Sequence, residues 1–235
     1  MIQTETLAGL NAAEAELILK ESSREKDLGQ RIARISSRFL GRPYVVGPLE
    51  GGASAPEVLR VSLAGFDCVT YIETVLALAQ SGTLDEFIEA IRAMRYAAGV
   101  VDWRCRNHYM IDWVRNNEAR GIIRDLTGGD LTVEKTRTLA VVEGLPHKRV
   151  TFRCFPKKNL PRVRSLIQTG DLMLFASTRK LLDVFHTGLI IKNDEMILLR
   201  HATRLAGAVI EQSLTEFLDA NRMSGFILLR PLCKE

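Results

Sequence analysis

The chain has 235 residues and a formal net charge of +4, with 46% hydrophobic and 26% charged residues. This length allows a sizeable hydrophobic core in one domain or two small ones, and the composition excludes a disordered or fibrous chain. The charge is too small to indicate nucleic-acid binding, and apolar runs such as residues 172–176 are too short to span a bilayer.

Helical patterns dominate the first half of the chain. Over residues 11–40, apolar side chains recur at helical spacing with an interruption near Gly29, which predicts two helices. Three prolines and five glycines in residues 41–65 predict an irregular loop. Thr83 and Glu86 form a capping-box signature, which predicts the start of a further helix.

The second half is rich in short β-forming runs separated by turn residues. These runs cover residues 138–142, 150–155, 172–175, 184–191, 196–201, 208–212 and 226–229. Helices first and strands later predict an α+β fold, with the N-terminal helices packed on one face of an antiparallel sheet.

Several common site types are absent from the sequence. The phosphate-binding patterns G-x-x-x-x-G-K-[ST] and G-x-G-x-x-G do not occur. The four cysteines contain no C-x-x-C pair, which argues against a zinc ribbon or a disulfide-dense scaffold. Spacing leaves open one disulfide among Cys105, Cys154 and Cys233.

Residues 148–164 carry seven basic side chains and no acidic one. The simpler interpretation, which we favour, is a solvated loop. The alternative is an anion-binding rim for a substrate that bears carboxylates or phosphates.

A cysteine stands at the predicted start of a helix. Asp67 is a natural N-cap, which would place Cys68 at the first helical position. There the unpaired amides and the positive end of the helix dipole favour the thiolate. The alternative is a buried cysteine that only packs.

Two histidines flank a predicted hairpin turn. If the turn is centred on Asn193 and Asp194, His186 and His201 lie directly opposite each other on one face, with Cβ atoms about 5 Å apart. Spacing alone leaves three interpretations open: an inert polar pair, half of a metal site, or a general base with its orienting partner.

Six short segments occur in a defined order, at residues 42–47, 66–74, 106–113, 170–172, 185–188 and 200–203. In this order they resemble the N-acetylmuramoyl-L-alanine amidase-like branch of the NlpC-type cell-wall cysteine peptidases, which are papain-like enzymes. The resemblance implies a single papain-like α+β amidase domain over residues 1–235. Residues 1–40 would form a helical N-terminal extension, and residues 41–235 the catalytic core.

The resemblance also implies roles for individual residues. Cys68 would be the nucleophile, His186 the general base, and His201 the residue that orients His186. Tyr44 would be a substrate-binding residue, and its hydroxyl and the Cys68 amide would stabilise the oxyanion. No metal or organic cofactor is implied.

The implied substrate is peptidoglycan or a muropeptide, cut between N-acetylmuramic acid and L-alanine. The family's R-x-H-Y block places Arg106, His108 and Tyr109 near the cleft, although Tyr109 also fits a core position. On a helix, His108 and Asp112 would share one face, and we interpret Asp112 as structural.

Four alternatives remain open at this point. One is an endopeptidase of the same fold that cuts between D-glutamate and the diamino acid. A second is a zinc-dependent amidase with His108, His186 and His201 as ligands. The others are a non-catalytic wall-binding module and an acyltransferase. No nucleic acid or integral membrane segment is expected, and the oligomeric state is open.

The N-terminal residues lack a basic region followed by an apolar one, which is the pattern of a secretory leader. We therefore expect a periplasmic or extracellular protein if a leader was removed from this chain, and a cytoplasmic one otherwise.

Overall fold

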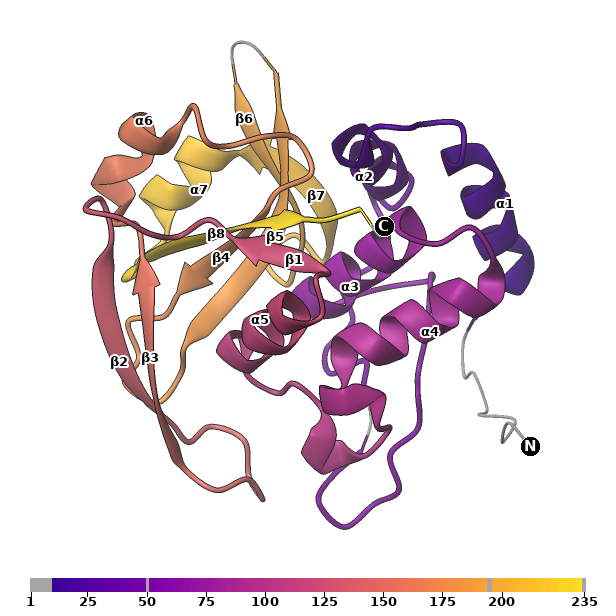
Figure 1. Ribbon diagram of the computed structural model, residues 1–235, viewed down its shortest axis with the longest axis horizontal. Helices are drawn as coiled ribbons and strands as arrows, with labels where there is room; N and C mark the ends of the chain where they lie inside the picture. Colours follow the sequence, from indigo (N-terminus) through magenta and orange to yellow (C-terminus); the bar gives the residue numbers. More distant parts are fainter. Residues whose placement is uncertain (1–9, 50, 194–195, 234–235) are drawn as a thin grey trace.

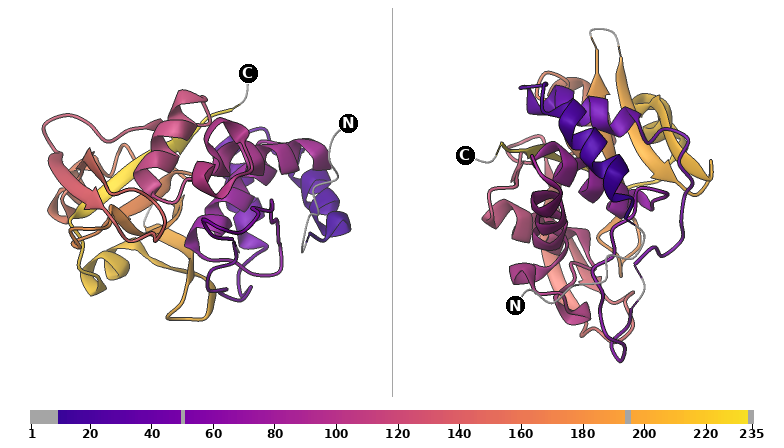
Figure 2. Two further views of the ribbon diagram at one scale, coloured as in Figure 1. Left: turned by 90° about the horizontal axis from the view of Figure 1, so that it is seen from below. Right: turned by 90° about the vertical axis from the view of Figure 1, so that its right-hand side faces the viewer.

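The computed structural model describes residues 10–49, 51–193 and 196–233. The larger helices of the first half gather on one side of the molecule and the strands on the other (Figure 1 and the left view of Figure 2). The larger helices of the first half are α1 (Ala12–Ser22), α2 (Leu28–Ser37), α3 (Cys68–Ala79), α4 (Leu84–Arg95) and α5 (Met110–Ala119). Short helical turns lie at η1 (Ala97–Gly99), η2 (Trp103–Cys105) and η3 (Lys157–Asn159).

The strands form a six-stranded antiparallel sheet and a separate two-stranded one. The large sheet has the order β1-β8-β4-β5-β6-β7, and β2 pairs with β3. The bounds are β1 (Ile123–Asp125), β2 (Val133–Leu139), β3 (Lys148–Cys154), β4 (Leu172–Ala176), β5 (Val184–Lys192), β6 (Ile197–Thr203), β7 (Ala208–Ser213) and β8 (Gly225–Pro231). The predicted α+β architecture with an antiparallel sheet is confirmed.

The hydrophobic core has two parts. The larger cluster joins the N-terminal helices to the sheet through residues such as Ile72, Leu174 and Ile227. The smaller cluster includes Phe175 and Phe217, and contains residues of α6 (Leu160–Val163) and α7 (Leu214–Ala220). The sheet is therefore a central layer with apolar side chains on both faces.

Helix α3 begins where its cap predicts. Asp67 Oδ1 accepts hydrogen bonds from the amides of Val69 at 3.1 Å and Thr70 at 2.8 Å, and Thr70 Oγ1 accepts one from the Asp67 amide at 3.0 Å. Every residue from Thr70 to Ala79 is buried. The helix is thus fixed in the core and presents its first residue, Cys68, at its N-terminal end.

The two predicted N-terminal helices are present, but Gly29 does not separate them. Asp27 caps α2, so Gly29 lies within its first turn. A Cβ atom at position 29 would lie 2.3 Å from the Thr169 carbonyl oxygen, so glycine is needed for this close approach. The glycine that resembles a helix break is a packing requirement.

Other local predictions are confirmed with changes. Thr83 caps α4 as expected, but Glu86 accepts a hydrogen bond from the Gly82 amide at 2.7 Å. Within the loop prediction, residues 41–49 and 51–65 contain isolated bridges and no strand or helix. The run predicted at 138–142 is wrong in position, because β2 ends at Leu139.

The basic segment is not a solvated loop. Its first part is β3, and several of its cations hold the fold: Lys148 pairs with Asp112, Arg153 Nε donates to Thr132 Oγ1 at 2.6 Å, and Lys157 Nζ donates to the Asn221 carbonyl at 2.9 Å. Three of the seven basic residues therefore make contacts that stabilise the fold.

A buried ion pair links α3 to α4. Arg95 Nε lies 2.8 Å from Glu73 Oε2, and their side chains are 3% and 2% exposed. Trp113 Nε1 of α5 also donates to Glu73 Oε1 at 3.1 Å, and Arg95 Nη1 donates to the Arg60 carbonyl. The pair therefore joins three helices and the loop that leads to Cys68.

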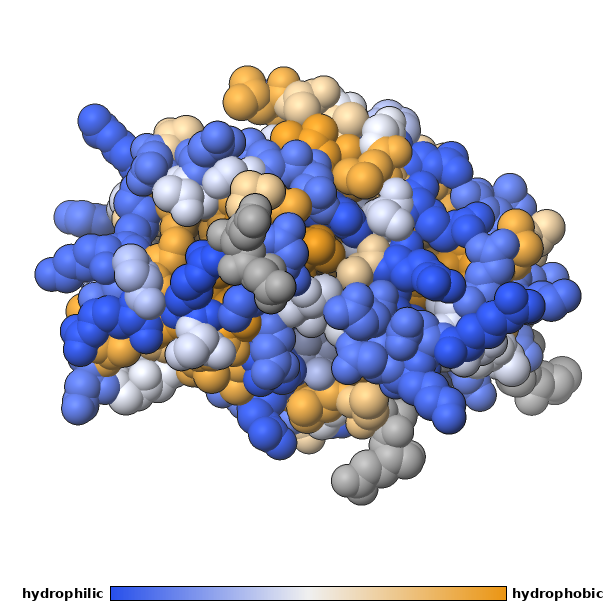
Figure 3. Space-filling view, turned by 90° about the horizontal axis from the view of Figure 1, so that it is seen from above, coloured by the Kyte–Doolittle hydropathy of each residue, from blue (hydrophilic) through white to orange (hydrophobic). Residues whose placement is uncertain are grey.

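Three further features concern membrane-spanning helices, the cysteines and the surface. Among the described residues, no helix is long and apolar enough to cross a membrane. Cys68, Cys105, Cys154 and Cys233 are free thiols. In the view from above, hydrophilic side chains dominate the surface and apolar ones form separate small groups (Figure 3).

Candidate active site

A cavity of about 290 Å³ lies at the N-terminal end of α3. It is lined by Cys68 together with His186 of β5, and also by Arg106 and His108 from the segment before α5. Four residues singled out from the sequence are thus brought together, although up to 118 positions separate them along the chain.

The thiol of Cys68 is held in its neutral form. Its pKa is raised to about 12, mainly by burial and in smaller part by the neighbouring Asp67 carboxylate. The backbone amides of Thr187, Cys68 and Val69 act in the opposite direction but are weaker. The expectation that the helix start favours the thiolate is therefore wrong for the resting site, because desolvation dominates.

The Thr187 amide also shows how Cys68 meets the sheet. In the β5–β6 ladder, the first pair is Lys192 with Ile197 and the last is Leu189 with Arg200. Thr187 therefore lies beyond the end of this ladder. Its amide faces the Cys68 sulfur. Because this amide follows His186 directly, the thiol lies beside the backbone that carries the candidate base.

The two histidines contact each other, but in a different register from the predicted one. Leu189 pairs with Arg200, so the hairpin is shifted by two residues and His186 is a diagonal neighbour of His201. A two-residue shift keeps both side chains on the same face. The distance between His186 Nε2 and His201 Nδ1 is 2.5 Å.

The shift arises because the turn is centred one residue later along the chain than predicted. Asn193 and Met196 close it, with the Asn193 amide donating to the Met196 carbonyl at 3.1 Å. Of the predicted turn centre, Asp194 lies outside the described residues. Gly188 makes room for the histidine pair, since a Cβ atom there would lie 2.9 Å from the His201 Cβ.

Both imidazoles are packed among aromatic rings. The Phe217 ring centroid lies 5.5 Å from that of His186 and 5.4 Å from that of His201. Burial lowers the pKa of His186 to about 3, with His201 contributing, and lowers the pKa of His201 to about 4. Both rings are therefore neutral at neutral pH, and each neutral ring has one N–H donor and one acceptor nitrogen.

Tyr44 lies near the candidate nucleophile. It bridges to Phe66 in the segment that leads into α3, and its amide donates to the Gly207 carbonyl at 2.8 Å. Burial raises the pKa of Tyr44, and the charges of Cys68 and Asp67 raise it further. Its hydroxyl is thus a neutral donor in the electrostatic environment of Cys68.

Arg106 and His108 are both fixed by neighbours at the cavity wall. Arg106 Nη2 lies 2.8 Å from Glu57 Oε2, and its side chain is 9% exposed. His108 Nε2 donates to the Trp103 carbonyl at 2.7 Å, and burial lowers its pKa. Nδ1 of neutral His108 is therefore a hydrogen-bond acceptor at the wall.

Tyr109 and Asp112 have structural places. Tyr109 is 2% exposed, and its hydroxyl accepts hydrogen bonds from the amides of Val141 and Val142. Helix α5 begins at Met110, so the expected helical face shared by His108 and Asp112 does not form. Asp112 pairs with Lys148, in agreement with its interpretation as structural.

Asp183 is a cavity residue that the sequence analysis did not identify. It is buried, and its carboxylate accepts hydrogen bonds from the amides of Ile111 at 2.8 Å and Val184 at 2.7 Å. It therefore fixes the start of α5 against β5. Another overlooked residue is Gln212, whose Nε2 lies 3.1 Å from His201 Nε2.

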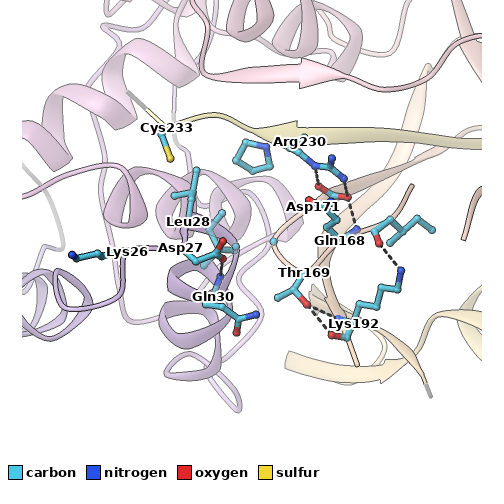
Figure 4. A pocket seen from close by; sticks show the side chains of 15 residues that line it. Lys26, Asp27, Leu28, Gln30, Gln168, Thr169, Asp171, Lys192, Arg230 and Cys233 are labelled. Atoms are coloured by element: carbon cyan, nitrogen blue, oxygen red, sulfur yellow. Dashed lines mark hydrogen bonds and ion pairs between the residues drawn. The ribbon is translucent and has the colours of Figure 1, made fainter. Parts of the chain in front are cut away.

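A larger cavity, of about 520 Å³, lies away from Cys68, between the start of α2 and the segment 167–171 (Figure 4). Several of its polar groups have partners within the fold: Arg230 pairs with Asp171, and Lys192 Nζ donates to the Ile167 carbonyl. This cavity brings together none of the candidate catalytic residues.

A metal site is not formed by the candidate residues. Within the described parts of the chain, no group of three or more His, Cys, Asp or Glu side chains is arranged to hold a metal ion. His186 and His201 bind each other, while His108 binds the Trp103 carbonyl. The three ligands required by the zinc alternative are thus not brought together.

Comparison with known families is decisive for the broader assignment. Residues 34–226 match the family model AmiA-like, described as N-acetylmuramoyl-L-alanine amidase-like. The chain belongs to this AmiA-like family. No curated protein sequence matches the chain.

Solved structures share the fold of this AmiA-like chain. An N-acetylmuramoyl-L-alanine amidase from Bacteroides uniformis is 25% identical with a TM-score of 0.78, covering 87% of this chain and 99% of its own. A Legionella pneumophila protein is 22% identical with a TM-score of 0.82, covering 94% and 96%. A Bacteroides fragilis protein named as a candidate xylanase is 25% identical with a TM-score of 0.72, covering 84% and 99%. Neighbours with different names show that the fold alone does not define the substrate.

The raised pKa of Cys68 gives a direct prediction for its alkylation. Only the thiolate reacts with iodoacetamide, so the rate at Cys68 should rise about tenfold per pH unit from pH 7 to 10 without levelling. In urea the same rate should level near the ordinary thiol pKa of about 8.5. Peptide mass spectrometry measures both profiles. A rate independent of pH in the folded protein would instead indicate a preformed thiolate–imidazolium pair.

Proposed function

We propose that this AmiA-like protein is a cysteine-dependent amidase that hydrolyses the bond between N-acetylmuramic acid and L-alanine in peptidoglycan or muropeptides. The observation that carries the proposal is the shared cavity of Cys68 and His186, with His201 bound to the far nitrogen of His186. The family assignment supports the substrate class. We further propose that the fold is an NlpC-type, papain-like one, because a helix supplies the thiol and the sheet supplies the histidines.

The chemistry begins with a neutral thiol and a neutral imidazole. Because His186 Nε2 is bound to His201, Nδ1 is the atom left to accept the thiol proton. Cys68 Sγ attacks the amide carbonyl carbon as this proton moves to His186. The proton then passes to the leaving nitrogen as the C–N bond breaks, leaving a thioester and a free amine.

Water completes the reaction. His186 removes a proton from water, whose oxygen attacks the thioester carbon. The C–S bond breaks, and the proton returns to Cys68, while the acyl group leaves as a carboxylic acid. The Cys68 amide and the Tyr44 hydroxyl would donate to the oxyanion in both steps. Action on intact wall would place the protein in the periplasm or outside the cell, whereas action on recycled fragments would place it in the cytoplasm.

The remaining polar residues of the cavity can hydrogen-bond the amide groups of a peptide substrate. His108 Nδ1 and the neighbouring Asn107 side chain lie at the same wall as Arg106. Since Glu57 neutralises Arg106, we assign to Arg106 an orienting hydrogen-bond role in place of a bare charge. We assign no substrate-binding role to Tyr109, because it is buried and its hydroxyl binds the amides of Val141 and Val142.

Mass spectrometry of defined muropeptides tests the proposed function. The wild type should release N-acetylmuramic acid and a peptide that begins with L-alanine, and EDTA should not change the rate. Release of an N-acetylmuramoyl dipeptide would instead indicate cleavage after D-glutamate. Activity lost with EDTA would indicate a metal enzyme, and binding without cleavage would indicate a recognition module.

A further inference from the structure

A glutamine on the next strand extends the histidine pair. Gln212 of β7 has its Nε2 atom 3.1 Å from His201 Nε2, and His201 Nδ1 lies 2.5 Å from His186 Nε2. Three side chains from the adjacent strands β7, β6 and β5 thus form one hydrogen-bonded row. The row ends at the cavity that contains Cys68.

The hydrogen bonds in this row couple the tautomers of both rings. A neutral imidazole has one N–H donor and one acceptor nitrogen. His186 Nδ1 can accept a proton only when the His186 proton is on Nε2, which then donates to His201 Nδ1. The His201 proton must consequently be on Nε2, where it needs an acceptor at position 212.

The amide of Gln212 offers both a donor end and an acceptor end. When Nε2 faces His201, it donates to the ring, so the His201 proton is on Nδ1 and the His186 proton is on Nδ1. When the amide turns by 180°, Oε1 accepts from His201 Nε2, and His186 Nδ1 becomes free. We propose that Gln212 is a positioning residue that selects the tautomer of both histidines, with the Oε1-facing orientation as the productive one.

The change from one pair of tautomers to the other conserves protons. One proton passes from His201 Nδ1 to His186 Nε2, and the proton of His186 Nδ1 leaves to water in the cavity beside Cys68. Water on the other side returns one proton to His201 Nε2. Both rings remain neutral throughout. The assignment of His186 as the base comes from the proposed function, whereas the coupling of the tautomers comes from the contacts alone.

The surroundings allow this rotation of the amide. A third cavity, of about 370 Å³, is lined by Gln212, His201 and His186, which gives the amide space. Phe217 contacts both rings, so packing holds them in position. The titratable groups that face the row are Glu216 of α7, which lines the same cavity, and those at the His186 end, which are Cys68, Asp67, His108 and Asp183.

Charged groups on the neighbouring strands point elsewhere. Arg200 pairs with Glu211 and donates to the Ala33 carbonyl of α2 at 2.7 Å. That pair therefore lies on the opposite face of the sheet from His201, which contacts α7. The amide of Gln212 is consequently the group that contacts His201 at Nε2, on the side of the ring away from His186.

Nitrogen-15 NMR of histidine tautomers tests the proposal without substrate. In Gln212→Glu, whose ionised carboxylate can only accept, the protons of both His201 and His186 should be on Nε2. In Gln212→Met, which has neither donor nor strong acceptor, the two tautomers should mix. The exposed Gln30→Met variant is the control and should match the wild type. Identical tautomers in all four proteins would overturn the proposal.

Kinetics supply the second readout. Gln212→Met should lower kcat about 10- to 100-fold with KM unchanged, as for other residues that orient a functional histidine. Gln212→Glu should keep kcat within about threefold of the wild type, and its carboxylate should move the acid limb of the pH profile upward. Equal losses in both variants would indicate a merely structural role and overturn the proposal. If no protein cleaves muropeptides but the tautomers follow residue 212, the proposed function fails and this inference stands.

Discussion

Replacing His186 by Ala is expected to lower kcat/KM for muropeptide cleavage by about 10⁴-fold, because the base proposed to take the thiol proton is removed. The resting thiol is neutral, since its pKa is raised to about 12. Attack therefore depends on a base at the moment of reaction, and a preformed thiolate cannot compensate. Initial rates measured with a defined muropeptide provide the comparison.

The control for this substitution is His147→Ala, which changes an exposed histidine. It should leave kcat/KM unchanged. Circular dichroism should show that both variants are folded. An activity of His186→Ala within tenfold of the wild type would mean that another group acts as the base, and the assignment of His186 would be abandoned.

Replacing Arg95 by Ala should destabilise the protein by about 3–5 kcal/mol. The substitution leaves the Glu73 carboxylate buried without its cation, and burial already raises the pKa of Glu73. Because Glu73 also binds Trp113 of α5, the loss affects the packing of three helices. For a chain of this size the melting temperature should fall by about 10 °C.

Two further variants test the cause of that loss. Glu73→Met combined with Arg95→Met removes both buried charges and should recover much of the stability. Arg38→Ala breaks an ion pair with Glu21 whose side chains are 38% and 47% exposed, and should cost less than about 1 kcal/mol. Urea unfolding measures all of these. Equal losses for Arg38→Ala and Arg95→Ala would show that burial does not determine the effect.

Local signals in the sequence were sufficient to predict the nucleophile helix. The Asp67 cap acts on amides two and three residues away, so its effect is contained in a short segment. The strand runs of the second half were likewise recognisable from their composition. Position 29 shows the limit of such reasoning, because the need for glycine there comes from Thr169 on a distant segment.

The histidine pair could be predicted only in part. The sequence correctly predicted that His186 and His201 lie on one face of the sheet. Side chains alternate between the two faces along a strand, so a two-residue shift in pairing does not change the face. Their exact register depends on where the turn is centred, which local composition does not determine. Gln212 could not be found because its contact with His201 arises only when β7 pairs with β6.

The electrostatics of the site depended on the whole fold. A helix start by itself favours a thiolate, yet burial of Cys68 reverses the direction of its pKa. His108 and Tyr109 are adjacent in the sequence, but His108 lines the cavity, whereas the Tyr109 hydroxyl binds the backbone at residues 141–142. Burial of this kind comes from long-range packing and is not visible in a motif.

The substitution Cys68→Ala, with Cys105→Ala as its control, tests the central claim most directly. Each variant and the wild type would be incubated with the same muropeptide, and products would be quantified by mass spectrometry. We expect Cys68→Ala to lose at least about 10⁴-fold in rate, because the attacking atom is removed, and Cys105→Ala to match the wild type. A Cys68→Ala variant that still cleaves at the wild-type rate would contradict the cysteine mechanism.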